Sequence, residues 1–184
     1  RRFHRPAHAT LVRTKTQKEL LKSRGFTHLK VWPGAVDTQL FRPRGKEALS
    51  LPRPIAMYMG RVAVEKGIGA FLGLQLPGSK VVVGGGPDLD KLRQHYPAAH
   101  FLGPRFGEEL AGLLSAADVF VFPSRTDTLG LVMLEAMACG IPVAAFPVPG
   151  PIDVIQEGST GAMDTDLAAA IYRALRLDGE ACIE

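Results

Sequence analysis

From residue 54 onward, short runs of β-branched and other apolar residues alternate with segments whose apolar residues recur at helical spacing. Continuous apolar runs are typical of strands buried on both faces, and their alternation with helices is the pattern of a parallel sheet covered by helices. The candidate strands are PIAMYMG (54–60), KVVVGG (80–85), HFLG (100–103), DVFVFPS (118–124) and IPVAAFP (141–147). The sequence therefore predicts an α/β fold for this part of the chain.

Helices are expected between and after these strands. Pro87 favours the start of one helix, and Gly140 favours the end of another. The last helix has Asp164 or Thr165 as its expected N-cap, followed by apolar residues at helical spacing. The expected helices cover residues 87–96, 107–117, 129–139 and 164–177. We predict a Rossmann-like sheet with helices on both faces over residues 54–184.

Residues 1–33 do not begin such a domain. They hold two expected strands, ATLVRT and HLKVWP, around an expected helix, QKELLKSRG. Two strands and one helix bury too little surface to form a core of their own. We therefore interpret residues 1–33 as the end of a preceding domain, and residues 34–53, with their prolines and arginines, as the connector to the sheet domain.

The composition indicates a globular chain in the cytoplasm. Hydrophobic residues make up 46% of the 184, yet no apolar run approaches the roughly 18 residues of a membrane span. The first ten residues also lack the apolar core of a secretory signal. Cys139 and Cys182 lie far apart without ligand-like spacing, so we expect two reduced thiols rather than a disulfide or a metal site.

The net charge of +4 conceals an uneven distribution. Residues 1–66 hold 15 lysines and arginines against 4 acidic residues, whereas residues 67–184 hold 7 against 14. This distribution favours an anionic partner such as membrane headgroups or a phosphorylated ligand, unless the basic residues only form a solvated surface. No nucleic-acid-binding pattern accompanies them, so we expect no nucleic-acid partner.

The stretch SRTDTLG (124–130) lies between an expected strand and an expected helix. Ligands of open parallel sheets bind beyond the carboxyl ends of the strands, and the N–H groups of a helix N-terminus attract phosphate. Glu135 follows within the apolar helix, where an unpaired carboxylate is costly. Glu135 is therefore expected either to pair with a buried arginine or backbone amides, or to accept hydrogen bonds from the hydroxyl groups of a ligand.

Three further charged residues accompany Glu135. Asp127 precedes it by eight positions, which on one continuous helix would separate them by about 12 Å. This is too far for a glycosidase carboxylate pair, so the two acids suit different parts of a long ligand. Arg61 and Lys66 follow the first strand of the domain and suit a diphosphate, although an ordinary solvated loop has the same composition.

A glycine-rich turn follows the strand at 80–85. Gly84 and Gly86 occupy two positions of a dinucleotide-binding fingerprint, but Leu89 takes the place of the third glycine. The turn is expected instead to allow the close approach of a ligand or of neighbouring backbone. Neither a metal nor a cofactor is expected.

Taken together, GRVAVEKG, VVVGGGP, HFLGPRFGEEL, ADVFVFPSRTDTLGLVMLEAMACGIPVAA and GPIDVI resemble the C-terminal half of retaining GT-B glycosyltransferases of glycosyltransferase family four. The resemblance is greatest to bacterial mannosyl- and glucosyltransferase-like members and covers about residues 54–178. It implies that residues 1–33 end an acceptor-side domain and that residues 34–53 form the interdomain hinge. It also implies transfer of a hexose from a UDP- or GDP-sugar with retention of configuration and without a metal.

The resemblance also implies a role for each matching residue. Arg61 and Lys66 would hold the donor diphosphate, and Glu135 would accept hydrogen bonds from the ribose. Asp127, where the family more usually has Glu, would be the catalytic acid that faces the donor sugar. The remaining implied contacts are the backbone amides of Thr128, Leu129 and Gly130 at the phosphates, and the turn containing Gly103 and Arg105 at the base.

Ala35 replaces a hinge glycine of the family pattern, which could take a positive φ. Because the family's acceptor domain and catalytic histidine precede these residues, we expect a fragment that binds nucleotide but is inactive alone. A cell-envelope glycolipid or polysaccharide is the expected acceptor, reached at the inner face of an anionic membrane. The alternatives are a nucleotide-sugar epimerase, a pyridoxal-phosphate phosphorylase of the same fold, and a non-enzymatic anion-binding module.

Overall fold

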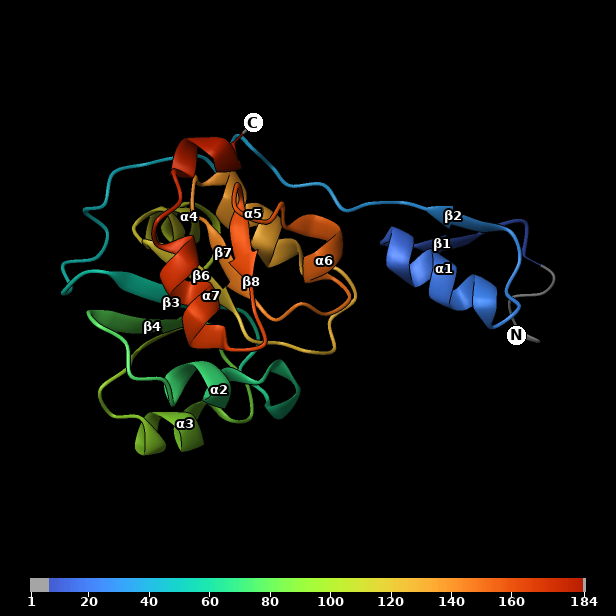
Figure 1. Cartoon of the computed structure of the whole chain (residues 1–184). Helices are drawn as coiled ribbons and strands as arrows, with labels where there is room; N and C mark the ends of the chain where they lie inside the picture. Colours follow the sequence, from blue (N-terminus) through green and yellow to red (C-terminus); the bar gives the residue numbers. More distant parts are fainter. Residues whose placement is uncertain (1–6, 184) are drawn as a thin grey trace.

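Six parallel strands form one sheet, in the order β5-β4-β3-β6-β7-β8, in the computed structural model (Figure 1). The strands are β3 (Ile55–Met59), β4 (Ser79–Val83), β5 (His100–Gly103), β6 (Val119–Phe122), β7 (Val143–Ala145) and β8 (Gly161–Met163). The first five coincide with the predicted runs, so the predicted α/β fold is confirmed. The structure describes residues 7–183, and residues 1–6 of the expected N-terminal segment lie outside the described residues.

The edge strand β8 is not apparent from the sequence pattern. It has three residues and pairs with β7 from Val143–Gly161 to Ala145–Met163. A Cβ atom on Gly161 would lie 2.2 Å from the carbonyl oxygen of Val143, so the pairing depends on the absence of a side chain there. Contact with β7, rather than local propensity, therefore decides that this segment is a strand.

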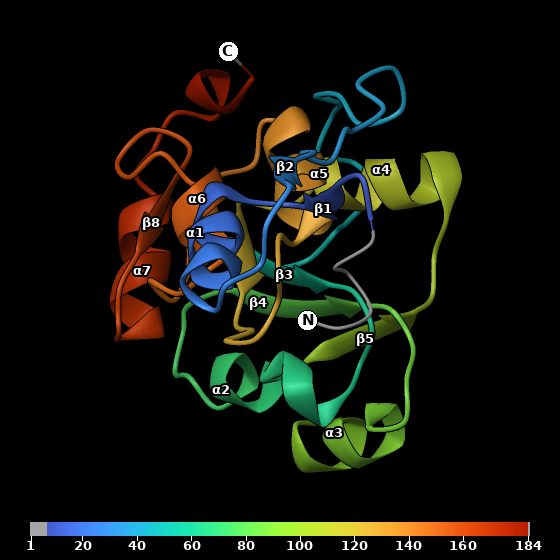
Figure 2. The ribbon, with the colours of Figure 1, turned by 90° about the vertical axis from the view of Figure 1, so that its right-hand side faces the viewer.

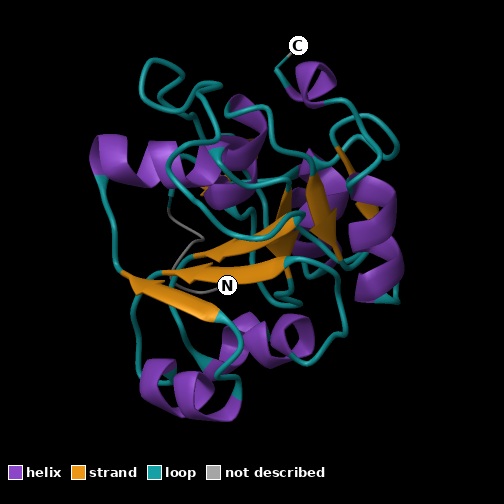
Figure 3. Ribbon diagram, turned by 90° about the vertical axis from the view of Figure 1, so that its left-hand side faces the viewer, coloured by secondary structure: helices purple, strands orange, loops and turns teal. Residues whose placement is uncertain are grey.

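Helices cover both faces of the sheet (Figure 3). One face carries α2 (Ile68–Leu72), α3 (Leu89–His95) and α7 (Leu167–Ala174), and the other carries α4 (Gly107–Ser115), α5 (Leu131–Ala138) and α6 (Pro151–Val154). Along β3, Met57 and Met59 point to the second face, whereas Ala56 and Tyr58 point to the first, as the alternation of a strand requires. The sequence does not predict α2 or α6, because four or five residues are too few to show a helical period.

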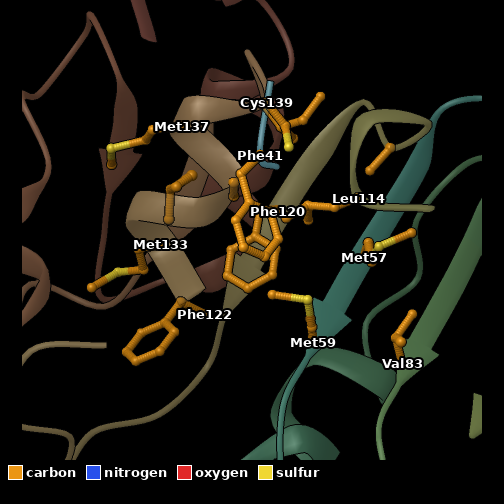
Figure 4. Close-up of a cluster of buried hydrophobic side chains, with 14 of the residues drawn as sticks. Phe41, Met57, Met59, Val83, Leu114, Phe120, Phe122, Met133, Met137 and Cys139 are labelled. Atoms are coloured by element: carbon orange, nitrogen blue, oxygen red, sulfur yellow. The ribbon is translucent and has the colours of Figure 1, made fainter. Parts of the chain in front are cut away.

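The larger of the two cores lies between the sheet and the helices α4 and α5 (Figure 4). Its labelled side chains include Met57 and Met59 of β3, Phe120 and Phe122 of β6, and Met133 and Met137 of α5. Phe41, from the segment before the sheet domain, packs into the same cluster. Lys46 also donates a hydrogen bond of 2.9 Å to the carbonyl oxygen of Ser115 at the end of α4. These contacts hold the connector against the sheet domain.

The N-cap of α7 is Asp166, so the prediction of Asp164 or Thr165 is wrong. Oδ1 of Asp166 accepts a hydrogen bond of 2.9 Å from the backbone N–H of Ala168. Asp164 instead accepts from the backbone N–H of Asp166, at 2.9 Å, within the preceding turn. Three neighbouring residues could each serve as a cap, and only the backbone geometry selects among them.

The N-terminal residues form a separate unit of β1 (Thr10–Val12), α1 (Lys15–Ser23) and β2 (Leu29–Val31), which matches the strand, helix and strand predicted there. The two strands pair in parallel, and α1 has no buried residue. Figures 1 and 2 show this unit beside α6, at the end of an extended connector. The assignment of residues 1–33 to a preceding domain and of 34–53 to a hinge stays a prediction.

Ala35 does not have the positive φ that a glycine could take at its position. Among residues 7–183, the only non-glycine residue with a positive φ is His28. The neighbouring Gly34 lies close to α5, since a Cβ atom on it would lie 2.1 Å from Cδ2 of Leu131. The connector therefore passes directly over the first residue of α5.

Both cysteines are free and buried. Within residues 7–183, no helix has the length and apolar character needed to cross a membrane.

Candidate functional site

A pocket of about 330 Å³ opens where β3 and β6 end, at the carboxyl edge of the sheet. The segment after β3 contributes Arg61 and Lys66, and the loop after β6 contributes Asp127 and the residues that lead into α5. Arg13, from the N-terminal unit, completes the lining. The two segments that the sequence singles out separately are therefore brought together in one cavity.

Lys66 and Asp127 form an ion pair inside this pocket, with 2.6 Å between Nζ and Oδ1. Both side chains are largely shielded, with exposed fractions of 25% and 22%. Oδ2 of Asp127 is buried and has no hydrogen-bond partner within residues 7–183. The pocket thus holds a carboxylate whose second oxygen is free to accept a hydrogen bond from a ligand.

The backbone around Lys66 explains why this lysine reaches the loop after β6. Lys66 ends a short 3₁₀ helix, η1 (Val64–Lys66), and Gly67 follows in the left-handed conformation with φ 64°. A Cβ atom on Gly67 would lie 2.7 Å from the carbonyl oxygen of Pro123. The glycine therefore lets the end of η1 pack directly against the loop that carries Asp127.

Arg61 is more exposed than Lys66, with an exposed side-chain fraction of 65%, and lies 3.4 Å from Oε1 of Glu65. Its backbone carbonyl accepts a hydrogen bond of 2.8 Å from the hydroxyl group of Tyr58, whose side chain is buried. Burial, and then the nearby charges of Asp127 and Glu65, raise the pKa of Tyr58. The neutral tyrosine therefore holds the backbone of the segment after β3 in place.

Residues 128–132, which line the same pocket, have backbone N–H groups without an acceptor. Gly130 takes φ 75° before α5, and a Cβ atom on it would lie 2.8 Å from the ring of Phe122. The amides of residues 128–132 donate to no acceptor within the described part of the chain. Free donors in a loop and in the first turn of the helix that follows it attract an anion through their partial positive charge.

Glu135 lies further along α5 and does not line this pocket. Its side chain is half-buried, and it has no hydrogen bond or ion pair with another residue in 7–183, so the expected structural partner, an arginine or backbone amides, is not found there. Burial raises the pKa of its carboxyl group.

The helix α5 is less buried than expected, because Leu131 is 38% exposed. Asp127 precedes the helix, so the separation expected on a continuous helix does not apply.

The glycine-rich turn after β4 packs against the segment after β3. A Cβ atom on Gly84 would lie 1.9 Å from the carbonyl oxygen of Gly60. A Cβ atom on Gly86 would lie 2.2 Å from the carbonyl oxygen of Val62. The N–H of Gly84 donates to the carbonyl oxygen of Gly103 at 2.9 Å. Arg105 pairs with Glu109 at 3.3 Å. None of the four predicted residues Gly84, Gly86, Gly103 and Arg105 lines the pocket, so their contact with a ligand stays a prediction.

Two lysines matter for the pyridoxal-phosphate alternative, because that chemistry needs a free lysine amine. Nζ of Lys80 donates 2.5 Å hydrogen bonds to the carbonyl oxygens of Leu72 and Leu74. Lys91 is exposed on α3, away from the pocket described above.

Within residues 7–183, no group of three histidine, cysteine or acidic side chains is placed to hold a metal ion.

Arg13 is a charged lining residue that the sequence did not suggest. It lies about fifty residues before the other cations, and nothing in the local pattern links it to them. Its guanidinium group lies 6.0 Å from the ring of Trp32. Only the folding of the N-terminal unit beside the sheet domain brings it to the pocket.

The fold is that of the C-terminal domain of GT-B glycosyltransferases. The solved structure of sucrose-phosphate synthase from Thermosynechococcus elongatus superposes with a TM-score of 0.80 at 30% identity, covering 96% of this chain and 51% of that one. Residues 53–177 match the family model described as glycosyl transferases group 1, and the chain belongs to this family.

Two curated relatives extend the comparison. A GDP-mannose-dependent alpha-mannosyltransferase of Mycobacterium tuberculosis is 36% identical over 169 aligned positions, and the match covers 88% of this chain and 45% of the relative. The sulfoquinovosyl transferase SQD2 of Arabidopsis thaliana is 37% identical over 179 aligned positions, and the match covers 86% of this chain and 35% of the relative. The chain thus spans less than half the length of either relative.

Proposed function

We propose that this chain is the donor-binding part of a retaining glycosyltransferase of family four, which transfers a hexose from a UDP- or GDP-sugar. The observation that carries the proposal is the row of five acceptor-free amides, residues 128–132, in the pocket that holds Lys66. Backbone donors and fixed cations together bind a diphosphate. The mannosyltransferase relative is named for its dependence on GDP-mannose, which supports a donor of this class.

In the proposed reaction, the bond between the anomeric carbon of the sugar and the diphosphate oxygen breaks. The acceptor hydroxyl forms the new bond on the same face, and its proton passes to the leaving diphosphate. Lys66, Arg61 and the amides stabilise the charge that develops on the diphosphate. Asp127 would contact the hydroxyl groups of the donor sugar through its unpartnered Oδ2.

We further propose a glycolipid or polysaccharide of the cell envelope as the acceptor. The enzyme would then act in the cytoplasm, at the inner face of the membrane. Residues 1–66, with their excess of lysine and arginine, would meet anionic lipids there.

Isothermal titration calorimetry of the chain with UDP and with GDP tests the proposed donor site. We expect one of the two nucleotides to bind, with its UMP or GMP counterpart binding more weakly because it lacks the second phosphate. A folded sample that binds neither diphosphate would refute the proposal.

Glu135 is the proposed acceptor of hydrogen bonds from the ribose, so replacing it with Gln should weaken nucleotide affinity. The same replacement should stabilise the free protein at neutral pH. Burial raises the pKa of the Glu135 carboxyl group, so its ionised form is costly in the folded protein. This cost is present above the folded-state pKa, and Gln removes it. The gain in stability should therefore vanish as the pH falls below the pKa of about 4.3 that Glu has in an unfolded chain. Thermal unfolding at pH 7 and pH 4, together with calorimetry, measures both effects. Unfolding of the variant would show that Glu135 has a structural partner instead.

A further inference from the structure

Arg13 reaches the pocket from a different part of the chain than the other cations that line it. It directly follows β1 in the N-terminal unit, and its side chain is exposed. No carboxylate within residues 7–183 forms an ion pair with its guanidinium group. Its guanidinium carbon lies 6.0 Å from the centre of the Trp32 ring, and its side-chain N–H groups donate to no other residue in 7–183, so they are available to a ligand.

The charges of the pocket make this free arginine significant. Lys66 is paired with Asp127 at 2.6 Å, and Arg61 lies 3.4 Å from Glu65. Each of these two cations is therefore partly neutralised before a ligand binds. A nucleoside diphosphate carries more than one negative charge, so a cation that the protein has not already paired would strengthen its binding.

The backbone of Arg13 is held in a defined place. Its N–H donates to Oε1 of Gln17 at 2.9 Å, while the N–H of Gln17 donates to Oγ1 of Thr14 at 3.0 Å, which caps α1. The start of α1 is in turn tied to the sheet domain. Oδ1 of Asp153, on α6, accepts from the backbone N–H of Thr16 at 3.1 Å and from its hydroxyl group at 2.9 Å.

We propose that Arg13 is a further binding residue for the diphosphate of the nucleotide, and that Asp153 positions it by holding the start of α1. The inference rests on the proposed donor site and adds a contact from the N-terminal unit. Binding of the diphosphate would then bridge the two parts of the chain. Asp153 itself does not line the pocket and acts only through Thr16.

Calorimetric titration of Arg13→Ala with UDP and GDP tests the first part. We expect the affinity of the diphosphate that binds to fall roughly tenfold to a hundredfold, as is typical of a lost charge-assisted hydrogen bond. Affinity for the corresponding nucleoside, followed by NMR titration, should not change. Lys30→Ala is the matched control, because it removes an exposed cation from the same unit at a position that does not line the pocket.

A double-mutant cycle tests the positioning role of Asp153. Asp153→Ala alone should weaken diphosphate binding, but it should add no further loss in the Arg13→Ala background, because the affected contact is already absent. Thr16→Val, which removes only the hydroxyl donor, should cause a smaller loss and serves if Asp153→Ala does not fold. Additive losses would show that Asp153 does not act through Arg13.

The outcomes separate this inference from the proposed function. If Lys66→Ala weakens UDP or GDP binding and Arg13→Ala does not, the inference is wrong and the donor site stands. An equal loss of nucleoside and diphosphate affinity in Arg13→Ala would also overturn it, because the lost contact would not be with phosphate. If the unaltered chain binds no nucleotide, both are wrong.

Discussion

Replacing Lys66 with Ala should weaken the binding of UDP or GDP by about a hundredfold, the largest loss expected from a single side chain of the pocket. Two effects act together. The variant loses a shielded cation at the diphosphate, and it leaves the Asp127 carboxylate without its partner at 2.6 Å. That uncompensated negative charge then repels the diphosphate.

The contribution of repulsion can be measured separately. Adding Asp127→Asn to Lys66→Ala removes the uncompensated charge and should restore part of the lost affinity. Arg61→Ala is the matched control, and its loss should be smaller because Arg61 is 65% exposed and its charge is screened by water. Calorimetry on the four proteins gives the comparison. Unchanged binding by Lys66→Ala would place the diphosphate elsewhere.

Replacing Gly84 with Ala should destabilise the protein by more than about 3 kcal/mol, the largest stability effect we expect. Gly84 takes φ 139°, and a Cβ atom would lie 1.9 Å from the carbonyl oxygen of Gly60. The clashing atom belongs to the backbone, so no side-chain rotation relieves it. The segment after β3 would have to move, and with it the backbone that carries Arg61.

Gly85→Ala is the control for this prediction. A Cβ atom on Gly85 would make ordinary contacts of 3.7 Å with the ring of Pro104, and this residue has no positive φ. Thermal unfolding should show a fall in Tm on the order of 10 °C for Gly84→Ala and little change for Gly85→Ala. Similar Tm values for the two variants would mean that the turn can relax at low cost.

The strands β3 to β7 were predictable because each lies within one of the apolar runs of the sequence, whereas β8 does not. Gly161–Met163 is too short and too rich in small residues to carry a pattern, and only β7 makes it a strand. The N-cap of α7 was likewise not predictable. Three adjacent polar residues precede the helix, and the backbone geometry makes Asp166 the cap. Local sequence thus specifies elements that lie in a recognisable apolar pattern and leaves the others to their neighbours.

In the candidate site, the sequence predicted individual residues but not the contacts between them. Lys66 and Asp127 could each be selected from the sequence, because each follows a predicted strand and lies at the carboxyl edge of the sheet. Their direct ion pair was not predicted, since it depends on Gly67 packing against Pro123. Glu135 was selected as an acid in an apolar helix, and the structure adds that its carboxylate has no partner within residues 7–183.

By itself, the sequence determined the parallel sheet with its two helical layers and the segments that meet at its carboxyl edge, because apolar periodicity and strand direction are local properties of the chain. Only the tertiary structure decided which side chains share the pocket. Arg13 joins Lys66 there because Asp153 holds the start of α1 against the sheet domain. Such a contact joins residues more than a hundred positions apart, and no local pattern in a single sequence encodes it.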